Sequence, residues 1–304
     1  EALARMANAI QSLAASGTAN PALSVANLTQ IGLADVSSNN LSALLGTIAG
    51  KADDGTATDS LAKLQTLVNG LNAAADRLAA FAEANSSGLA NATGTVPDLA
   101  AYTAAGVTGV TDGANGNLAS INDALASDPV KAVQANSPAA LQAIVDAYNA
   151  ILAEANDTAH SAGDDTADAT PTADPSVAQF AAIGADIGAA ATDANTLALL
   201  NDILGTQQTA DVDRIAEVEA LARMANAIQS LAAGGTPNPA LSVANLTQIG
   251  LADVRDNNLA APPTALAGKA DDAPATDPLA KLHTPADGLH PPAHPPAPPA
   301  PPPP

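Results

Sequence analysis

The sequence predicts an all-α protein built from tandem three-helix-bundle modules, with a continuous α-helical solenoid as the alternative arrangement. Hydrophobic residues make up 47% of the chain, but aromatic residues make up only 1%, so Ala, Leu, Val and Ile dominate the apolar content. Alanine is the strongest helix former. Apolar residues recur with helical spacing, and the same helix–helix–helix pattern returns several times along the chain.

The first helix of each module is short and ends at a glycine. Segments with this pattern are SVANLTQIG (24–32), PDLAAYTAAG (97–106), PSVAQFAAIG (175–184) and a further copy at 242–250. The first three carry one large side chain at the same place, Leu28, Tyr102 or Phe180. Each segment ends at the residue type expected in a left-handed helix C-cap, namely Gly32, Gly106, Gly184 or Gly250.

A polar turn and a second helix follow each short helix. The predicted second helices are NNLSALLGTIAG (39–50), GNLASINDALAS (116–127) and NTLALLNDILG (195–205). Asn or Asp residues stand near each start, where such side chains cap the exposed backbone N–H groups of a helix.

The third helix of each module is the longest. We expect third helices over residues 58–84, 138–155 and 211–233, and residues 1–15 repeat part of the last one. Between Leu141 and Ala155 the apolar residues follow i, i+3, i+4, i+7 spacing, which gives one buried stripe. Asp59 stands where it would cap the first of these long helices.

Polar loops rich in Gly, Ser, Thr, Asp and Pro separate the modules. The long loop at 156–174 favours separate modules over a continuous solenoid. The predicted division of the chain is 1–16 as the third helix of a truncated module, then three-helix modules at 21–85, 96–156 and 174–233, then 239–304 as a degraded copy of module 21–85 with a Pro-rich tail.

A longer repeat overlies these modules. Residues 1–40 return at 219–258, where Ser16, Ala19, Ser37 and Ser38 are replaced by Gly234, Pro237, Arg255 and Asp256. The second copy is preceded by DVDRIAEV (211–218), which supplies a first helical turn that the first copy lacks. We therefore expect that residue 1 is not a natural start and that the chain is a fragment of a longer tandem array.

Beyond Asn258 the copy changes steadily towards proline and histidine. Leu44 and Leu45 correspond to Pro262 and Pro263, and the chain ends in PPAPPAPPPP. We interpret residues 259–304 as a deteriorating sequencing read of the same repeat, and the alternative is a genuine polyproline II spacer. Either way proline stops helix formation there, and we do not expect a metal site at His283, His290 and His294.

The charge of the chain excludes some partners. Its formal net charge is −21, from 31 acidic and 10 basic residues. Nucleic acids are not expected partners, because phosphate binding needs clustered Lys and Arg. The chain has no cysteine, which excludes disulfides and thiolate metal sites. It has no apolar run of about 18 residues, so we expect no membrane insertion in this segment.

The sequence offers no catalytic, cofactor-binding or metal-binding candidates, and we expect no enzyme. His160 stands in a polar loop. The acidic stretches DDGTATD (53–59) and GDDTAD (163–168) do not match the EF-hand loop, so calcium binding is not expected. Four aromatic residues lie on apolar helix faces and are expected in the core: Phe81, Tyr102, Tyr148 and Phe180.

One module resembles a known family. AAYTAAGVTGV (100–110), NLASINDAL (117–125) and LQAIVDAYNAILAEA (141–155) together are similar to the GA module, a three-helix bundle of bacterial surface proteins, some of which bind serum albumin. The Ala-rich units also resemble the tandem helical repeats of giant proteobacterial adhesins and biofilm proteins. The second helix lacks the aromatic residues of the albumin binders, and we expect Leu118, Ile121 and Leu125 in the core, so the resemblance implies the fold more than albumin binding.

The repeats predict a non-catalytic spacer or stalk, and the resemblance implies that it is a repeat segment of a large secreted adhesin-like protein at the bacterial cell surface. The alternative is a set of protein-binding modules that grip a host or matrix protein by avidity. Surface pattern separates the two hypotheses. A binder should expose an apolar patch repeated in every module, whereas a spacer should expose variable polar faces.

Overall fold

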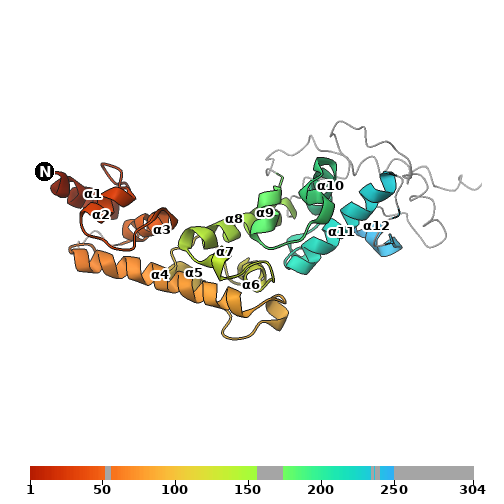
Figure 1. The fold of residues 1–304 in the computed structure, drawn as a ribbon, viewed down its shortest axis with the longest axis horizontal. Coiled ribbons are helices and arrows are strands. Elements are labelled where there is room, and N and C mark those ends of the chain that lie inside the picture. The colour runs from red at the N-terminus through yellow and green to blue at the C-terminus, as the bar shows by residue number, and fades with distance from the viewer. Residues whose placement is uncertain (52–55, 156–173, 234–235, 237–239, 250–304) are drawn as a thin grey trace, which may run out of the picture. The chain divides into compact units, whose positions relative to one another are not determined.

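The structure is a computed structural model that describes residues 1–51, 56–155, 174–233, 236 and 240–249. Over this part of the chain the regular elements are helices (Figure 1), so the predicted all-α class is confirmed. The predictions about His160, the stretch 163–168, the C-cap at Gly250 and the tail from 259 lie outside the described residues, as does most of the predicted module 239–304.

The chain divides into two compact units. Of the described residues, the first contains 1–51, 56–154, 174–186 and 209–219, and the second contains 155, 187–208, 220–233, 236 and 240–249. The first unit holds α1 (Ala2–Ser16), α2 (Val25–Gln30), α3 (Ser38–Ala49), α4 (Leu61–Ala84), η1 (Leu89–Asn91), α5 (Leu99–Ala104), α6 (Leu118–Leu125), α7 (Ala132–Ala135), α8 (Pro138–Ala155), α9 (Val177–Ala182) and η3 (Thr209–Asp211). The second holds η2 (Gly188–Ala191), α10 (Ala194–Gly205), α12 (Val243–Gln248) and most of α11 (Ile215–Ala232).

The short helices end at glycines with left-handed backbone, as predicted. The φ angles are 98° at Gly32, 69° at Gly106 and 80° at Gly184. Gly106 also needs to be small. A Cβ atom there would lie 2.7 Å from the Cβ atom of Ala43 in α3 and 2.8 Å from Cδ2 of Leu71 in α4. The end of α5 therefore packs closely on the helices that precede it.

The predicted cap at Asp59 is wrong. Ser60 is the N-cap of α4, where its hydroxyl accepts the backbone N–H of Lys63 at 3.4 Å. The carboxylate of Asp59 instead lies 2.8 Å from the Lys63 ammonium. Serine takes the cap position because it stands immediately before the first helical residue, and a serine side chain caps as well as an aspartate does.

The second helices use several capping arrangements. Asp193 caps α10, accepting the backbone N–H of Thr196 at 2.7 Å, as expected for an acidic residue at this place. Ser37 caps α3, and Asn40 completes the arrangement by accepting the backbone N–H of Ser37 at 2.9 Å. Asn117 precedes α6 without a side-chain cap, because its amide is used elsewhere.

The long helix α4 contributes to two consecutive cores within the first unit. Its N-terminal half packs with α1, α2 and α3 around a buried cluster that includes Ile10, Leu28, Leu44 and Val68. The same helix also contacts α5, α6 and α7 (Figure 1). The four aromatic side chains are buried as expected. Ile121 and Leu125 are buried too, whereas Leu118 is half-buried. The module boundaries themselves stay a prediction.

Candidate functional site

The most regular feature of the described chain is a pair of polar residues spaced i, i+7 on each long helix. These pairs, which we call clamp pairs, are Gln65 and Asn72 on α4, Gln142 and Asn149 on α8, and Glu219 and Asn226 on α11. Residues at this spacing lie on one helix face, two turns apart. Each clamp pair therefore reaches two neighbouring points on another segment.

The clamp pair of α4 holds the loop between α2 and α3. The backbone N–H of Ala34 donates to Oε1 of Gln65 at 2.8 Å, and Nε2 of Gln65 donates back to the Ala34 carbonyl at 3.2 Å. One residue later, the Asp35 carbonyl accepts from Asn72 at 3.4 Å and from Asn40 at 2.7 Å. The loop is thus bound through its backbone, without regard to its side chains.

The clamp pair of α8 repeats this arrangement on the loop between α5 and α6. The backbone N–H of Thr108 donates to Oε1 of Gln142 at 2.8 Å, and Nε2 of Gln142 returns a bond to the Thr108 carbonyl at 3.0 Å. The Gly109 carbonyl accepts from Asn149 at 3.1 Å and from Asn117 at 2.7 Å. Asn117 also donates to the side-chain oxygen of Asn149.

The clamp pair of α11 makes the corresponding contacts with a glutamate in place of glutamine. In the first unit the backbone N–H of Asp186 donates to Oε1 of Glu219 at 3.2 Å. In the second unit Nδ2 of Asn226 donates to the Ile187 carbonyl at 3.1 Å. An ionised carboxylate accepts hydrogen bonds but donates none. Glu219 can therefore accept from the loop backbone but cannot donate back to a loop carbonyl, as Gln65 and Gln142 do.

The clamp pairs explain how each turn between a short and a second helix is satisfied. Ala34, Thr108 and Asp186 are exposed residues, and these turns have no sheet to fix their course, so the clamp pairs hold the turn backbone in place. Reasoning from single helices missed the clamps because glutamine and asparagine on a helix face look like ordinary solvated residues. The signal lies in the aligned long helices, QTLVNGLN (65–72), QAIVDAYN (142–149) and EALARMAN (219–226).

Buried polar side chains elsewhere also serve the fold. The Tyr102 hydroxyl donates to Oδ1 of Asn122 at 2.6 Å, and Asn122 donates to the Pro97 carbonyl at 2.8 Å. The Tyr148 hydroxyl donates to the Val212 carbonyl at 3.1 Å. Burial raises the pKa of both tyrosines above the usual range, so each stays a neutral hydrogen-bond donor.

Asp123 is a buried carboxylate that joins distant backbone segments. Its Oδ1 accepts the backbone N–H of Leu89 at 2.6 Å, and its Oδ2 accepts the backbone N–H of Ile215 at 2.8 Å. Ile215 is the first residue of α11, where the helix dipole and the unpaired N–H groups favour a negative charge. Both oxygens are therefore engaged in holding the fold.

Two further carboxyl groups have shifted pKa values with local causes. Partial burial, together with the nearby negative charge of Asp213, raises the pKa of Glu217. Hydrogen bonds from the side chain and the backbone of Thr196 lower the pKa of the Asp193 carboxyl. Both residues stand at helix starts; the capping bonds account for the shift of Asp193, whereas burial and the neighbouring negative charge outweigh the capping bond of Glu217 with the backbone of Arg214.

Among the described residues, no group of three or more His, Cys, Asp or Glu side chains is placed to hold a metal ion. Of the helices that the structure describes, none combines the length and the hydropathy that crossing a bilayer requires.

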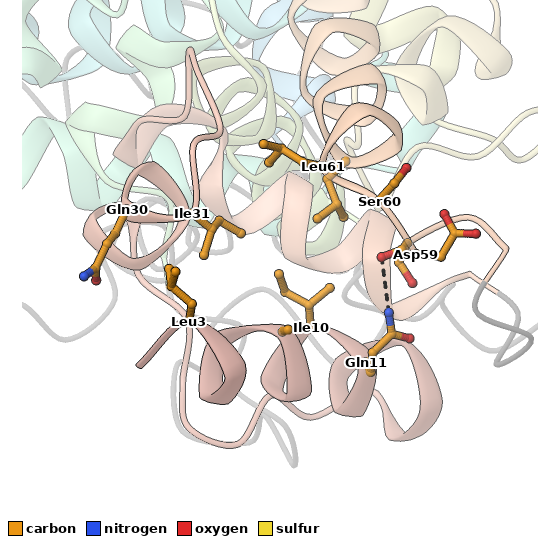
Figure 2. A pocket seen from close by; sticks show the side chains of 11 residues that line it. Leu3, Ile10, Gln11, Gln30, Ile31, Asp59, Ser60 and Leu61 are labelled. Atoms are coloured by element: carbon orange, nitrogen blue, oxygen red, sulfur yellow. Dashed lines mark hydrogen bonds between the residues drawn. The ribbon is translucent and has the colours of Figure 1, made fainter. Parts of the chain in front are cut away.

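A groove of about 350 Å³ lies between α1, the end of α2 and the start of α4. Leu3 and Ile10 from α1 line it together with Ile31 and Leu61 (Figure 2). Ile10 is buried, but Leu3 is 57% exposed and Leu61 is 44% exposed. Gln11 closes one end with a 3.2 Å hydrogen bond to the Thr58 carbonyl. Polar side chains complete the lining, so the groove is mixed in character; they are Gln11, Gln30, Thr58, Asp59 and Ser60.

No family model, curated protein or solved structure matches this chain.

Proposed function

We propose that this chain is a non-catalytic repeat segment that acts as a spacer or stalk in a large secreted, adhesin-like protein of the bacterial cell surface. The observation that carries the proposal is the double use of α4, which contributes to the cluster with α1, α2 and α3 and also contacts α5, α6 and α7. Helices shared in this way join neighbouring repeats rigidly, which is what a spacer needs. For residues 1–155 this sharing supports a continuous solenoid more than separate beads.

The distribution of exposed apolar side chains favours a spacer over binding modules. Among the described residues, the large apolar side chains that are exposed are Leu3, Leu61, Val96, Leu99 and Val133. Most of them occupy unrelated places in the repeat. Leu61 is exposed at the start of α4, but the residue at the corresponding place in α8 is Pro138. A module that gripped a host or matrix protein by avidity would present the same patch each time.

The absence of a catalytic role is also part of the proposal. The buried ionisable groups described above, Tyr102, Tyr148 and Asp123, direct their polar atoms at backbone carbonyls, backbone N–H groups or Asn122. Catalytic acids and bases instead face a cleft where a substrate can reach them. The net charge of −21 suits a spacer, because it limits association between neighbouring copies.

Distances between labelled sites test the spacer role. Ser16→Cys is combined with Ala119→Cys in one variant and with Thr192→Cys in another. All three positions are exposed, and the chain has no native cysteine. The distance between the two spin labels is measured in the full chain. A compact domain of this length has a radius of gyration of about 19 Å, which keeps surface sites within roughly 50 Å. We expect the distance from 16 to 192 to be longer than that limit. It should also be longer than the distance from 16 to 119. Two similar distances inside the compact limit would overturn the proposal.

A further inference from the structure

The same peptide occurs twice in this chain in different surroundings. EALARMAN forms residues 1–8 and residues 219–226. Leu3 is 57% exposed, whereas Leu221, its counterpart in α11, is fully buried. Ala4 and Ala7 are exposed as well, whereas their counterparts in α11, Ala222 and Ala225, are fully buried. The exposure on α1 therefore does not come from the residues themselves.

The corresponding face is buried on the other long helices too. Val68 and Leu71 stand at the places of Ala4 and Ala7 in α4, and both are buried. Val145 and Tyr148 stand at the same places in α8, and both are buried. Among the long helices described, α1 is alone in presenting this face to solvent.

The polar residues of α1 fit the same pattern. Glu1 and Asn8 occupy the places of Glu219 and Asn226, and both are exposed. Glu1 pairs with Arg5 of its own helix at 3.4 Å, whereas Glu219 accepts the backbone N–H of Asp186. The clamp pair of α1 thus has the chemistry to hold a loop backbone but is not holding one.

The groove extends this surface. Leu3 lies in its lining beside Ile31 and Leu61 (Figure 2), and Ala7 is part of the same lining. In the next repeat the places of Ala7 and Gly32 are taken by Leu71 and Gly106, and Ala43 of α3 packs directly against Gly106. The element that contacts the equivalent surface there is α3, a second helix, and a groove of about 830 Å³ lies between α3 and the start of α8.

We propose that the face formed by Glu1, Leu3, Ala4, Ala7 and Asn8 is a docking surface for a helix–turn–helix segment of another repeat, of the kind that residues 174–208 represent. Its turn would lie across the clamp pair, with one backbone N–H donating to Glu1 and the following carbonyl accepting from Asn8. Its second helix would cover Leu3 and the groove. The occupant follows from continuity with α11, where identical residues already bind the turn at 186 and 187.

The inference holds whether or not the chain is a spacer, because it concerns only how one repeat recognises another. The docking face also fixes the order of the backbone donor and acceptor that the incoming segment must offer. The carboxylate of Glu1 accepts but does not donate, so the incoming segment must offer a backbone N–H followed by a carbonyl. The middle of an amphipathic helix offers neither group, because its backbone groups are bonded internally, and each helix end offers only one of the two kinds.

Thiol protection tests the proposal in the full chain. Residues 174–218 are joined in front of Glu1, which recreates at α1 the sequence that leads into α11. Ala7→Cys and, separately, Leu3→Cys then report on the docking face, because the chain contains no other cysteine. We expect maleimide labelling of both sites to slow by roughly tenfold or more in the extended chain relative to the unextended one.

Matched variants define the limits of the measurement. Leu221→Cys gives the rate of a covered site, and Ser16→Cys, which is exposed, should label equally fast in both chains. Adding Asn8→Ala to the extended chain should restore part of the labelling rate. Unchanged rates at Ala7 and Leu3 in the extended chain, with Leu221→Cys still protected, would overturn the proposal. Concentration-dependent protection in the unextended chain would also overturn it, because the face would then bind a second copy.

Discussion

Asn117 on the start of α6 donates its side-chain amide both to Asn149 on α8 and to the Gly109 carbonyl, the latter at 2.7 Å. The Asn117 oxygen meanwhile accepts the backbone N–H of Thr111 at 2.7 Å. One buried amide thus joins a second helix, a long helix and the turn between helices. Asn40 and Asn72 form the same pair one repeat earlier, with the two amides 2.9 Å apart.

Replacing Asn117 with alanine should destabilise the fold measurably. The change leaves the Gly109 carbonyl and the Thr111 N–H short of partners, and an unsatisfied buried polar group costs about 1–3 kcal/mol. We expect Asn117→Ala to lower the free energy of unfolding in urea by that amount. Asn115→Ala, at an exposed neighbouring position, should stay within about 0.5 kcal/mol of the native chain. Equal effects of the two variants would contradict the role given to Asn117.

Gly106 should tolerate alanine far less well than Gly17 does. Their φ angles are nearly the same, 69° and 70°, so backbone strain on substitution is matched. A Cβ at Gly106 would meet Ala43 at 2.7 Å, whereas one at Gly17 would meet no atom within 4 Å. Overpacking adds about 1–3 kcal/mol. Chemical denaturation should show Gly106→Ala less stable than Gly17→Ala by this margin, and a smaller loss at Gly106 would argue against close packing of α5 on α3.

Asp123→Asn should be more damaging than Asp128→Asn. The first change keeps the size of the side chain but removes the charge that accepts the N–H groups of Leu89 and Ile215. Hydrogen bonds to charged groups contribute about 1.5–3 kcal/mol, and we expect a loss of this size in thermal or urea unfolding. The Asp128 side chain is 81% exposed and serves as the matched control. A neutral Asp123→Asn variant would show that the carboxylate charge is dispensable.

The two tyrosines predict how stability depends on alkaline pH. Burial raises the pKa of Tyr102 and of Tyr148 in the folded chain, while an unfolded tyrosine ionises near pH 10. The folded state therefore binds these protons more tightly, and stability is lost as the pH rises above about 10. Absorbance at 295 nm and helical circular dichroism should change together in one alkaline transition, since the chain has 2 tyrosines and no tryptophan. Tyrosinate absorbance that rises while helicity is intact would contradict the burial of these rings.

The sequence was a good guide wherever the determinant is local. The glycines that end α2, α5 and α9 were identified because positive φ is a property of the residue itself. The stripe in α8 was identified because burial follows helical spacing. The cap at Asp59 was misplaced by one residue, since Asp59 and Ser60 have nearly equal capping ability.

Features set by contacts between distant residues were not predicted. The short helix α7 has no periodic pattern, and it is positioned by Lys131, which donates to the Asn85 carbonyl at 2.6 Å, and by Glu83, which accepts the Ala132 N–H at 3.1 Å. The clamp pairs bring together residues such as Gln65 and Ala34 from different elements. Helix propensity carries no information about either arrangement.

The sharing of α4 between two cores makes the unfolding of neighbouring repeats interdependent. If one core unfolds and α4 frays, the other core loses contacts with the same helix. A state in which only one of the two cores is folded is therefore higher in free energy than it would be for independent repeats. A chain assembled in this way behaves as a one-dimensional cooperative lattice, in which stability depends on the coupling between neighbours as well as on each repeat. Stretching such an array should release it in blocks larger than one repeat, and a single weak repeat would be supported by those on either side.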